Sequence, residues 1–233
     1  MENKKILLTV DIDSTIGKRY KIHPSLAYSE LDFVNIVEMP EEDNYGDFYF
    51  YHGALNFLKE LHDLSKRYPI HLAFFTASFD SPVDKRNGLL IEFIKEKLDC
   101  DYKLYDAKFL TYRKMDLVMA KGPNVADSLP PGWQSWFEEL FTVYPIESLT
   151  HLEDEILFNG RFIKDHDTLI KLIGIEQQFS SIIHIDDDPL AMPRNYQERP
   201  NFHFFEFSKN DIEHAKKYRQ IKDGILSILN KAL

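Results

Sequence analysis

Short apolar runs recur along this chain, at residues 6–10, 71–75 and 182–185. Runs of this length that do not alternate with polar residues are typical of strands buried on both faces of a parallel sheet. Between the first two, residues 54–67 place apolar side chains three and four positions apart, which predicts an amphipathic helix. Strands that alternate with helices predict an α/β fold with a mostly parallel central sheet.

Further elements are predicted around these runs. The segment 16–50 combines aromatic and β-branched runs with acidic turns, and it predicts hairpin-like strands or a flap. Helical spacing recurs later in the chain, at 89–98, at 169–173 and at 211–232. Short strands are expected at 102–105 and 202–207.

Residues 107–158 interrupt this alternation. They contain several prolines, among them Pro123 and Pro130-Pro131, several acidic residues and both tryptophans, Trp133 and Trp136. A segment this long in a compact domain is usually functional or disordered, and its aromatic residues argue against disorder. We therefore predict an inserted lid or cap subdomain at 107–158, within a core formed by 1–106 and 159–233. The alternative is an extension whose tryptophans pack on the core.

The composition limits the classes of partner. The chain has 233 residues, of which 44% are hydrophobic, and a formal net charge of -10. This size fits one domain with an elaboration, and the acidic charge disfavours a nucleic acid or an anionic membrane as partner. The one cysteine, Cys100, excludes an intramolecular disulfide and fits a reducing compartment.

Targeting signals are not apparent in the sequence. No apolar stretch approaches the roughly 18 residues of a membrane span, and the first residues, Met1 to Lys5, do not resemble a signal peptide. We expect a cytoplasmic protein, although a secretion system that reads other signals would leave this pattern unchanged.

Acidic residues follow two of the buried runs. The first run continues into Asp11 and Asp13, and the third into Asp186, Asp187 and Asp188. Parallel strands end at the ligand crevice of an α/β sheet, so up to four carboxylates meet there if the two strands are neighbours. Such like charges persist only with a neutralising cation, a bound proton or separate chemical roles. The alternative is a pair of solvated turns, because aspartate favours turns.

Two further segments offer groups that suit a phosphoryl substrate. The second run ends in Thr76-Ala77, which supplies a hydroxyl and backbone N–H donors for phosphate oxygens. Lys164 offers the missing positive charge, with Lys171 as an alternative that falls within a helical pattern. Oxygen ligands without a neighbouring histidine or cysteine suit Mg²⁺. His184 alternates with buried aliphatic residues, so we expect it to pack in the core or beside the site.

Together, these motifs resemble the haloacid dehalogenase superfamily. Asp-x-Asp-x-Thr at 11–15, Phe-Thr-Ala-Ser at 75–78, Lys-Asp at 164–165 and Asp-Asp at 186–187 stand in the order of that family's motifs. The last three of these segments are most similar to the protein phosphatases that act on the C-terminal domain of RNA polymerase II and related phosphoproteins. The resemblance implies a Rossmann-like three-layer fold, with a cap inserted between the second and third motifs.

The resemblance also implies roles for the acidic residues. Asp11 is the nucleophile that attacks phosphorus, and it is also a Mg²⁺ ligand. Asp13 is the general acid and base, and its backbone carbonyl binds the metal. Asp187 ligates Mg²⁺, with Asp186 beside it.

The remaining motif residues are implied to bind the phosphoryl group. Thr76, with Ala77, holds phosphoryl oxygens, and Lys164 neutralises the nucleophile and the developing charge. The chain departs from the phosphatase branch in three ways: it lacks an Arg-Pro pair before the helix at 54–67, it has His166 in place of the usual leucine, and its insertion is longer. The insertion bears on substrate choice.

The expected activity is Mg²⁺-dependent hydrolysis of phosphomonoesters through an aspartyl-phosphate. We expect a phosphoprotein or phosphopeptide substrate, phosphorylated on serine, threonine or tyrosine. One alternative is a phosphatase of small phosphorylated metabolites, which a lid that seals the site would favour. The other is a catalytically silent binding protein that kept the fold, against which the presence of all the motif residues argues.

Overall fold

The computed structural model describes most of the predicted core. The described residues are 5–25, 28–39, 46–77, 85–107, 157–158, 161–162, 164–173, 179–193, 196–207 and 213–232. The predicted lid at 107–158 lies outside these residues, apart from Ala107, Leu157 and Phe158.

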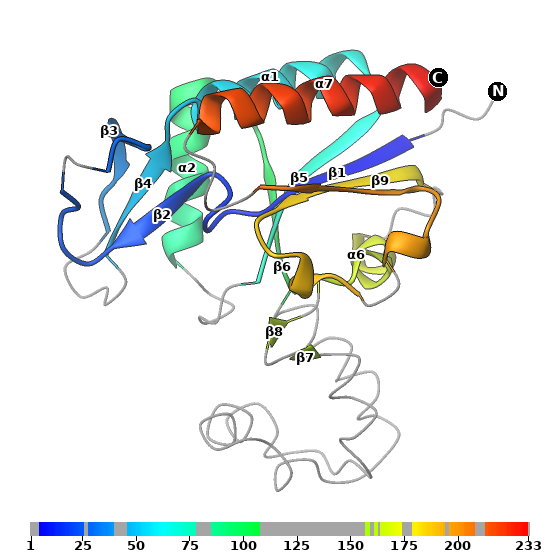
Figure 1. Ribbon diagram of the computed structural model, residues 1–233, viewed down its shortest axis with the longest axis horizontal. Coiled ribbons are helices and arrows are strands. Elements are labelled where there is room, and N and C mark those ends of the chain that lie inside the picture. The colour runs from blue at the N-terminus through cyan, green and yellow to red at the C-terminus, as the bar shows by residue number, and fades with distance from the viewer. Residues whose placement is uncertain are drawn as a thin grey trace, which may run out of the picture.

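A five-stranded parallel sheet forms the centre of the structure (Figure 1). Its strands are β1 (Lys5–Val10), β5 (Ile70–Thr76), β6 (Lys103–Asp106), β9 (Phe179–Asp186) and β10 (Phe202–Glu206). They are ordered β10-β9-β1-β5-β6, and every neighbouring pair is parallel. The predicted α/β class with a mostly parallel sheet is confirmed.

Helices cover both faces of this sheet. α1 (Ala54–Arg67) and α7 (His214–Ala232) lie side by side on one face, and α6 (His166–Ile173) lies on the other (Figure 1). Side chains alternate between the faces along each strand, so Leu8 of β1 belongs to the larger hydrophobic cluster, under α1 and α7, whereas Leu7 packs in the smaller cluster, on the α6 side. The sheet is therefore buried on both faces, which explains its continuous apolar strands.

Helix α1 has the bounds that the sequence predicts. Its buried residues recur at the helical spacing: Ala54, Phe57, Leu58, Leu61 and Leu64. Lys66 and Arg67 occupy its last turn, where positive charge favours the helix dipole. The next residue, Tyr68, is extended, as expected for a residue before proline.

A smaller antiparallel sheet lies beside the central one (Figure 1). It consists of β2 (Gly17–Tyr20), β4 (Asp47–Tyr51) and β3 (Leu31–Val37), in the order β2-β4-β3. This confirms the strands expected in the N-terminal part of the chain. Gly17 permits the close approach of β2 to β4, because a Cβ at this position would lie 2.3 Å from the carbonyl oxygen of Tyr49.

The remaining elements are shorter or flank the sheets. They are α2 (Lys85–Leu98), which begins before the predicted 89–98, the antiparallel pair β7 (Leu157–Phe158) and β8 (Arg161–Phe162), and the 3₁₀ turns η2 (Pro189–Ala191) and η3 (Tyr196–Glu198). Within the described part of the chain, no helix combines the length and the apolar character that crossing a membrane requires.

The fold predicts that alanine substitutions at two neighbouring positions of α1 have very different effects on the free energy of unfolding. Leu58 is fully buried in the main cluster, so we expect Leu58→Ala to lower the free energy of unfolding by about 2–5 kcal/mol, because it removes apolar contacts and leaves a cavity. Lys59 is exposed, so Lys59→Ala is the control, with a change of at most about 0.5 kcal/mol. Urea unfolding measures both, and equal effects would contradict the packing of α1.

Candidate active site

Asp11 and Asp186 lie at the ends of adjacent strands. β1 and β9 are parallel neighbours, with Val10 opposite Ile185, and the backbone N–H of Asp11 donates to the carbonyl of Ile185 at 2.8 Å. β5 and β6 extend the sheet on one side of β1, whereas β9 and β10 extend it on the other side. Ligands bind at such a reversal of strand order in α/β proteins, so the two acidic strand ends stand where a site is expected.

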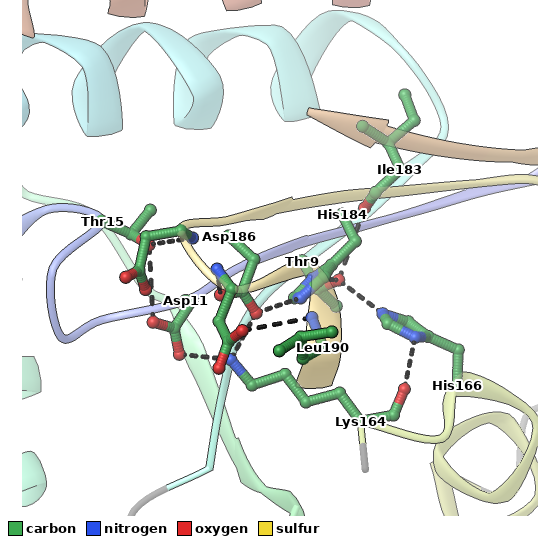
Figure 2. Close-up of polar contacts among 11 residues, drawn as sticks. Thr9, Asp11, Thr15, Lys164, His166, Ile183, His184, Asp186 and Leu190 are labelled. Carbon is green, nitrogen blue, oxygen red and sulfur yellow. Dashed lines mark hydrogen bonds and ion pairs between the residues drawn. The ribbon is translucent and has the colours of Figure 1, made fainter. Parts of the chain in front are cut away.

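The ammonium group of Lys164 lies between these two carboxylates (Figure 2). Its Nζ is 2.6 Å from Oδ1 of Asp11 and 2.5 Å from Oδ2 of Asp186. All three residues are buried, with exposed fractions of 2%, 4% and 0% for Lys164, Asp11 and Asp186. Buried charges are tolerated only when they are paired and hydrogen-bonded, and this lysine provides that pairing.

The three charges do not balance. Burial raises the pKa of Asp11 well above its ordinary value, and the charge of Asp186 adds to the rise, although Lys164 opposes it. Burial also opposes ionisation of Asp186, but Lys164 and a hydrogen bond from His184 outweigh it, so the pKa of Asp186 is lowered. The two aspartates likewise outweigh burial and raise the pKa of Lys164. One lysine is therefore shared between two aspartates, and Asp11 lacks a full compensating charge.

Asp187 completes a group of three carboxylates. One oxygen from each of Asp11, Asp186 and Asp187 lies within 4.8 Å of the others. Thr15 links two of these residues, because its hydroxyl lies 3.4 Å from Oδ2 of Asp11 and accepts the backbone N–H of Asp187 at 3.1 Å. Carboxylate oxygens suit a hard divalent cation, and such a cation would supply the charge that Asp11 lacks. The three carboxylates could therefore hold a divalent cation, and their chemistry is compatible with the expected Mg²⁺.

Asp13 lies on the turn after β1, outside the group of three carboxylates. Its side chain is 45% exposed, and Oδ1 lies 3.4 Å from Nε of Arg19. Ser14 adopts a positive φ of 65°, and its N–H donates to the carbonyl of Gly17 at 2.7 Å, which closes the turn. The turn thus places Asp11 and Asp13 in different environments.

Thr76 and Ala77 lie on the other side of Asp11. β5 is the second parallel neighbour of β1, with Phe74 opposite Val10, and it ends at Thr76. Thr76 is buried and Ala77 is half-buried. Thr76, the last residue of β5, and Ala77, which follows it, therefore stand at the same carboxyl edge of the sheet as Asp11.

Several site residues had no role in the sequence-based prediction. Thr15 belongs to the Asp-x-Asp-x-Thr motif, which was the available signal for it. His184 was expected to pack in the core or beside the site, and it lies beside the site, with its Nε2 2.9 Å from Oδ2 of Asp186. Thr9 contacts both His184 and His166 (Figure 2). Its signal was a hydroxyl within an apolar run, next to the site.

Comparison of the sequence with models of protein families and with curated proteins gave no match. The function is therefore inferred from the geometry of the site and from the resemblance of its motifs.

The raised pKa of Asp11 predicts a stability gain when its charge is removed. A carboxyl group whose folded pKa is raised stabilises the protein at low pH, and this contribution is lost as pH rises from the unfolded pKa of about 3.9 through the folded value. In the presence of chelator, we expect Asp11→Asn to unfold at higher urea than the wild type at pH 8. The gain should be about 1 kcal/mol, the free energy of roughly one pKa unit, because Lys164 keeps Asp186 as its partner, and it should be smaller at pH 5.

Asp101→Asn is the matched control, because Asp101 is exposed and its replacement should change stability little at either pH. A loss of stability in Asp11→Asn that grows between pH 5 and pH 8 would contradict the raised pKa of Asp11.

Proposed function

We propose that this chain is a Mg²⁺-dependent phosphatase of the haloacid dehalogenase type, which hydrolyses phosphomonoesters through an aspartyl-phosphate on Asp11. The observation that carries the proposal is the position of Lys164, whose Nζ lies 2.6 Å from Asp11 and 2.5 Å from Asp186, with Asp187 in the same carboxylate group. This arrangement supplies a nucleophile, a fixed positive charge and metal ligands at one point of the sheet.

In the first step, a carboxylate oxygen of Asp11 attacks phosphorus. The new O–P bond forms as the bond from phosphorus to the leaving oxygen breaks, and Asp13 gives its proton to that oxygen. Lys164 remains beside Asp11 and offsets charge on the transferring group. The half-exposed position of Asp13 suits a group that meets a leaving group at the edge of the site.

In the second step, Asp13 takes a proton from water. The water oxygen forms a bond to phosphorus, and the bond between phosphorus and Asp11 breaks, which releases inorganic phosphate and restores both carboxyl groups. General acid and base catalysis of this kind contributes on the order of 10²–10⁴-fold to a rate. Thr76 and Ala77, at the end of the neighbouring strand, would hold phosphoryl oxygens during both steps.

The metal would be held by Asp11 and Asp187, with the carbonyl of Asp13 as a further ligand. Asp186 already accepts hydrogen bonds from Lys164, from His184 and from the N–H of Asp188, so its part is mainly to hold the lysine. When bound, Mg²⁺ neutralises carboxylate charge and orients a phosphoryl oxygen.

The proposed substrates are phosphoproteins, on the basis of the motif similarity to that phosphatase branch. A panel of phosphopeptides and phosphorylated metabolites tests this choice. Phosphopeptides phosphorylated on serine, threonine or tyrosine should give the higher kcat/KM. A higher kcat/KM for the metabolites would indicate a phosphatase of small molecules with the same chemistry. If neither class is hydrolysed, the chain would instead be a binding protein that kept the fold.

Replacement of the nucleophile should abolish turnover. We expect Asp11→Asn to lower the rate with an aryl phosphate by several orders of magnitude, because the amide cannot form the covalent intermediate. Asp13→Asn should instead slow the cycle about 10²–10⁴-fold and accumulate acyl-phosphate, since water activation suffers most with a good leaving group. Quenched-flow assays with acid trapping distinguish the two, and Asp11→Asn with a tenth of the wild-type rate would contradict the assignment.

Chelation should abolish activity, and Mg²⁺ should restore it, whereas Ca²⁺ should not, because the larger ion takes more ligands at longer distances. Independently of turnover, Mg²⁺ should raise the melting temperature of the wild type more than that of Asp187→Asn, because the variant lacks one carboxylate ligand. Unchanged rates in excess chelator, together with equal melting shifts, would rule out the metal assignment.

A further inference from the structure

A second group of buried polar residues lies next to the ion pair of Lys164, between Asp186 and His166 (Figure 2). Thr9 and His184 are opposite each other on β1 and β9, and each stands two residues before a site carboxylate, Asp11 or Asp186. Because alternate residues of a strand share a face, this group lies on the same face of the sheet as the carboxylates.

His166 covers this group from the side of α6. It stands two residues after Lys164 and begins that helix, and its ring packs edge-on against that of His184 at 4.8 Å between centroids. Thr9, His166 and His184 each have an exposed fraction of 0%. We refer to these three residues as the buried relay.

The buried relay connects the two ends of Lys164. Oγ1 of Thr9 lies 2.8 Å from Nδ1 of His184 and 2.9 Å from Nε2 of His166. The other nitrogen of His184, Nε2, is 2.9 Å from Oδ2 of Asp186, and Nδ1 of His166 is 3.0 Å from the backbone oxygen of Lys164. A continuous path of four contacts therefore runs from the main chain of the lysine to the carboxylate that its ammonium binds.

The two end contacts determine where the imidazole hydrogens lie. A carbonyl oxygen only accepts, so Nδ1 of His166 donates to Lys164, and an ionised carboxylate only accepts, so Nε2 of His184 donates to Asp186. In neutral imidazoles, both remaining nitrogens are acceptors directed at Thr9. The single hydroxyl hydrogen of Thr9 then has two nitrogen acceptors at nearly equal distances, and the carbonyl oxygen of Ile183 at 3.4 Å is a third, more distant acceptor.

Because this hydrogen is shared, the buried relay stabilises the core less than apolar side chains would. At any moment at least one of the two acceptor nitrogens faces an oxygen lone pair, and an incompletely satisfied buried network is less stable than apolar side chains of similar shape. Stability therefore does not account for three polar residues here. Buried polar groups that are not fully hydrogen-bonded depart from the usual rules of core packing, and such departures are expected at functional sites.

We propose that Thr9, His166 and His184 are positioning residues that hold Lys164 and Asp186 in place for the proposed phosphatase reaction. His166 fixes the main chain of the lysine, His184 fixes the oxygen that its ammonium binds, and Thr9 sets the distance between the two. The proposal rests on the proposed function, and it adds three residues to which the sequence motifs assign no role.

The first test needs no activity. Nitrogen-15 NMR of the histidine rings in the metal-free protein, assigned with His166→Gln and His184→Gln, reports which ring nitrogens carry hydrogen. We expect hydrogen on Nδ1 of His166 and on Nε2 of His184. If either of these two nitrogens carries no hydrogen, the proposal is overturned. His203→Gln is the matched control, because His203 lies on β10 outside the relay, and its replacement should leave the other two signals unchanged.

The second test compares Thr9→Val with Thr9→Ser in hydrolysis of an aryl phosphate with Mg²⁺. Thr9→Val keeps the shape of the side chain without the hydroxyl. We expect kcat to fall roughly 10–100-fold, the range for losing a group that orients a metal-site residue, with KM nearly unchanged. The N–H of Lys164, which donates to Ala191 at 2.7 Å, should also exchange with deuterium faster. Thr9→Ser should recover most of the rate and the protection.

A triple variant keeps the test decisive if single variants fold poorly. Thr9→Val, His166→Leu and His184→Ile together replace the buried relay with apolar side chains, so the melting temperature should stay equal or rise while kcat remains low. Wild-type kcat in this triple variant, or losses in Thr9→Val that merely follow a lowered melting temperature, would overturn the positioning role. Absence of hydrolysis by the wild type would contradict the proposed function instead.

Discussion

The Lys164 ammonium is the interaction on which the arrangement of the site depends. Pairing of β1 with β9 brings Asp11 and Asp186 to adjacent strand ends, and two like charges at such a place are unstable when buried. The effective cost of burying one uncompensated ion is several kcal/mol. Lys164 reduces this cost by binding one oxygen of each carboxylate, and it comes from a segment 153 residues away from Asp11. The site therefore exists only when three distant segments meet.

Lys164 does not offset the whole cost of burying two carboxylates. The negative charge that stays uncompensated bears on the function proposed for the site. Lys164 helps to lower the pKa of Asp186, whereas the pKa of Asp11 stays raised, chiefly by burial. The surrounding core, with fully buried residues such as Leu8 and Phe74, supplies the stability that tolerates such a group. A metal cation would meet an environment that already favours added positive charge at Asp11. Active sites are commonly built in this way, with local instability supported by the rest of the fold.

The sequence was most informative about features that follow from strand geometry. Buried apolar runs predicted the central strands, and their acidic ends predicted that Asp11 and Asp186 could share one edge of the sheet. The first inference depends on strand length and apolar character, which a single run of residues reveals. The second also required the two strands to be neighbours, which the pairing of β1 with β9 confirms. The partner of a buried polar side chain is different, because it depends on packing between distant elements. Thr9 and His184 were visible as polar residues within apolar runs, but their contact with His166 follows from the position of α6 over the sheet.

The same contrast explains the separate environments of Asp11 and Asp13. A spacing of two would place both side chains on one face if β1 continued, but the strand ends at Val10 and the positive φ of Ser14 closes a turn. Asp11 consequently remains buried beside Lys164, whereas Asp13 is half-exposed next to Arg19. Two carboxyl groups in unlike environments are suited to different chemical roles. The end of one strand thus separates a buried carboxylate, which fits a nucleophile, from an accessible one, which fits proton transfer.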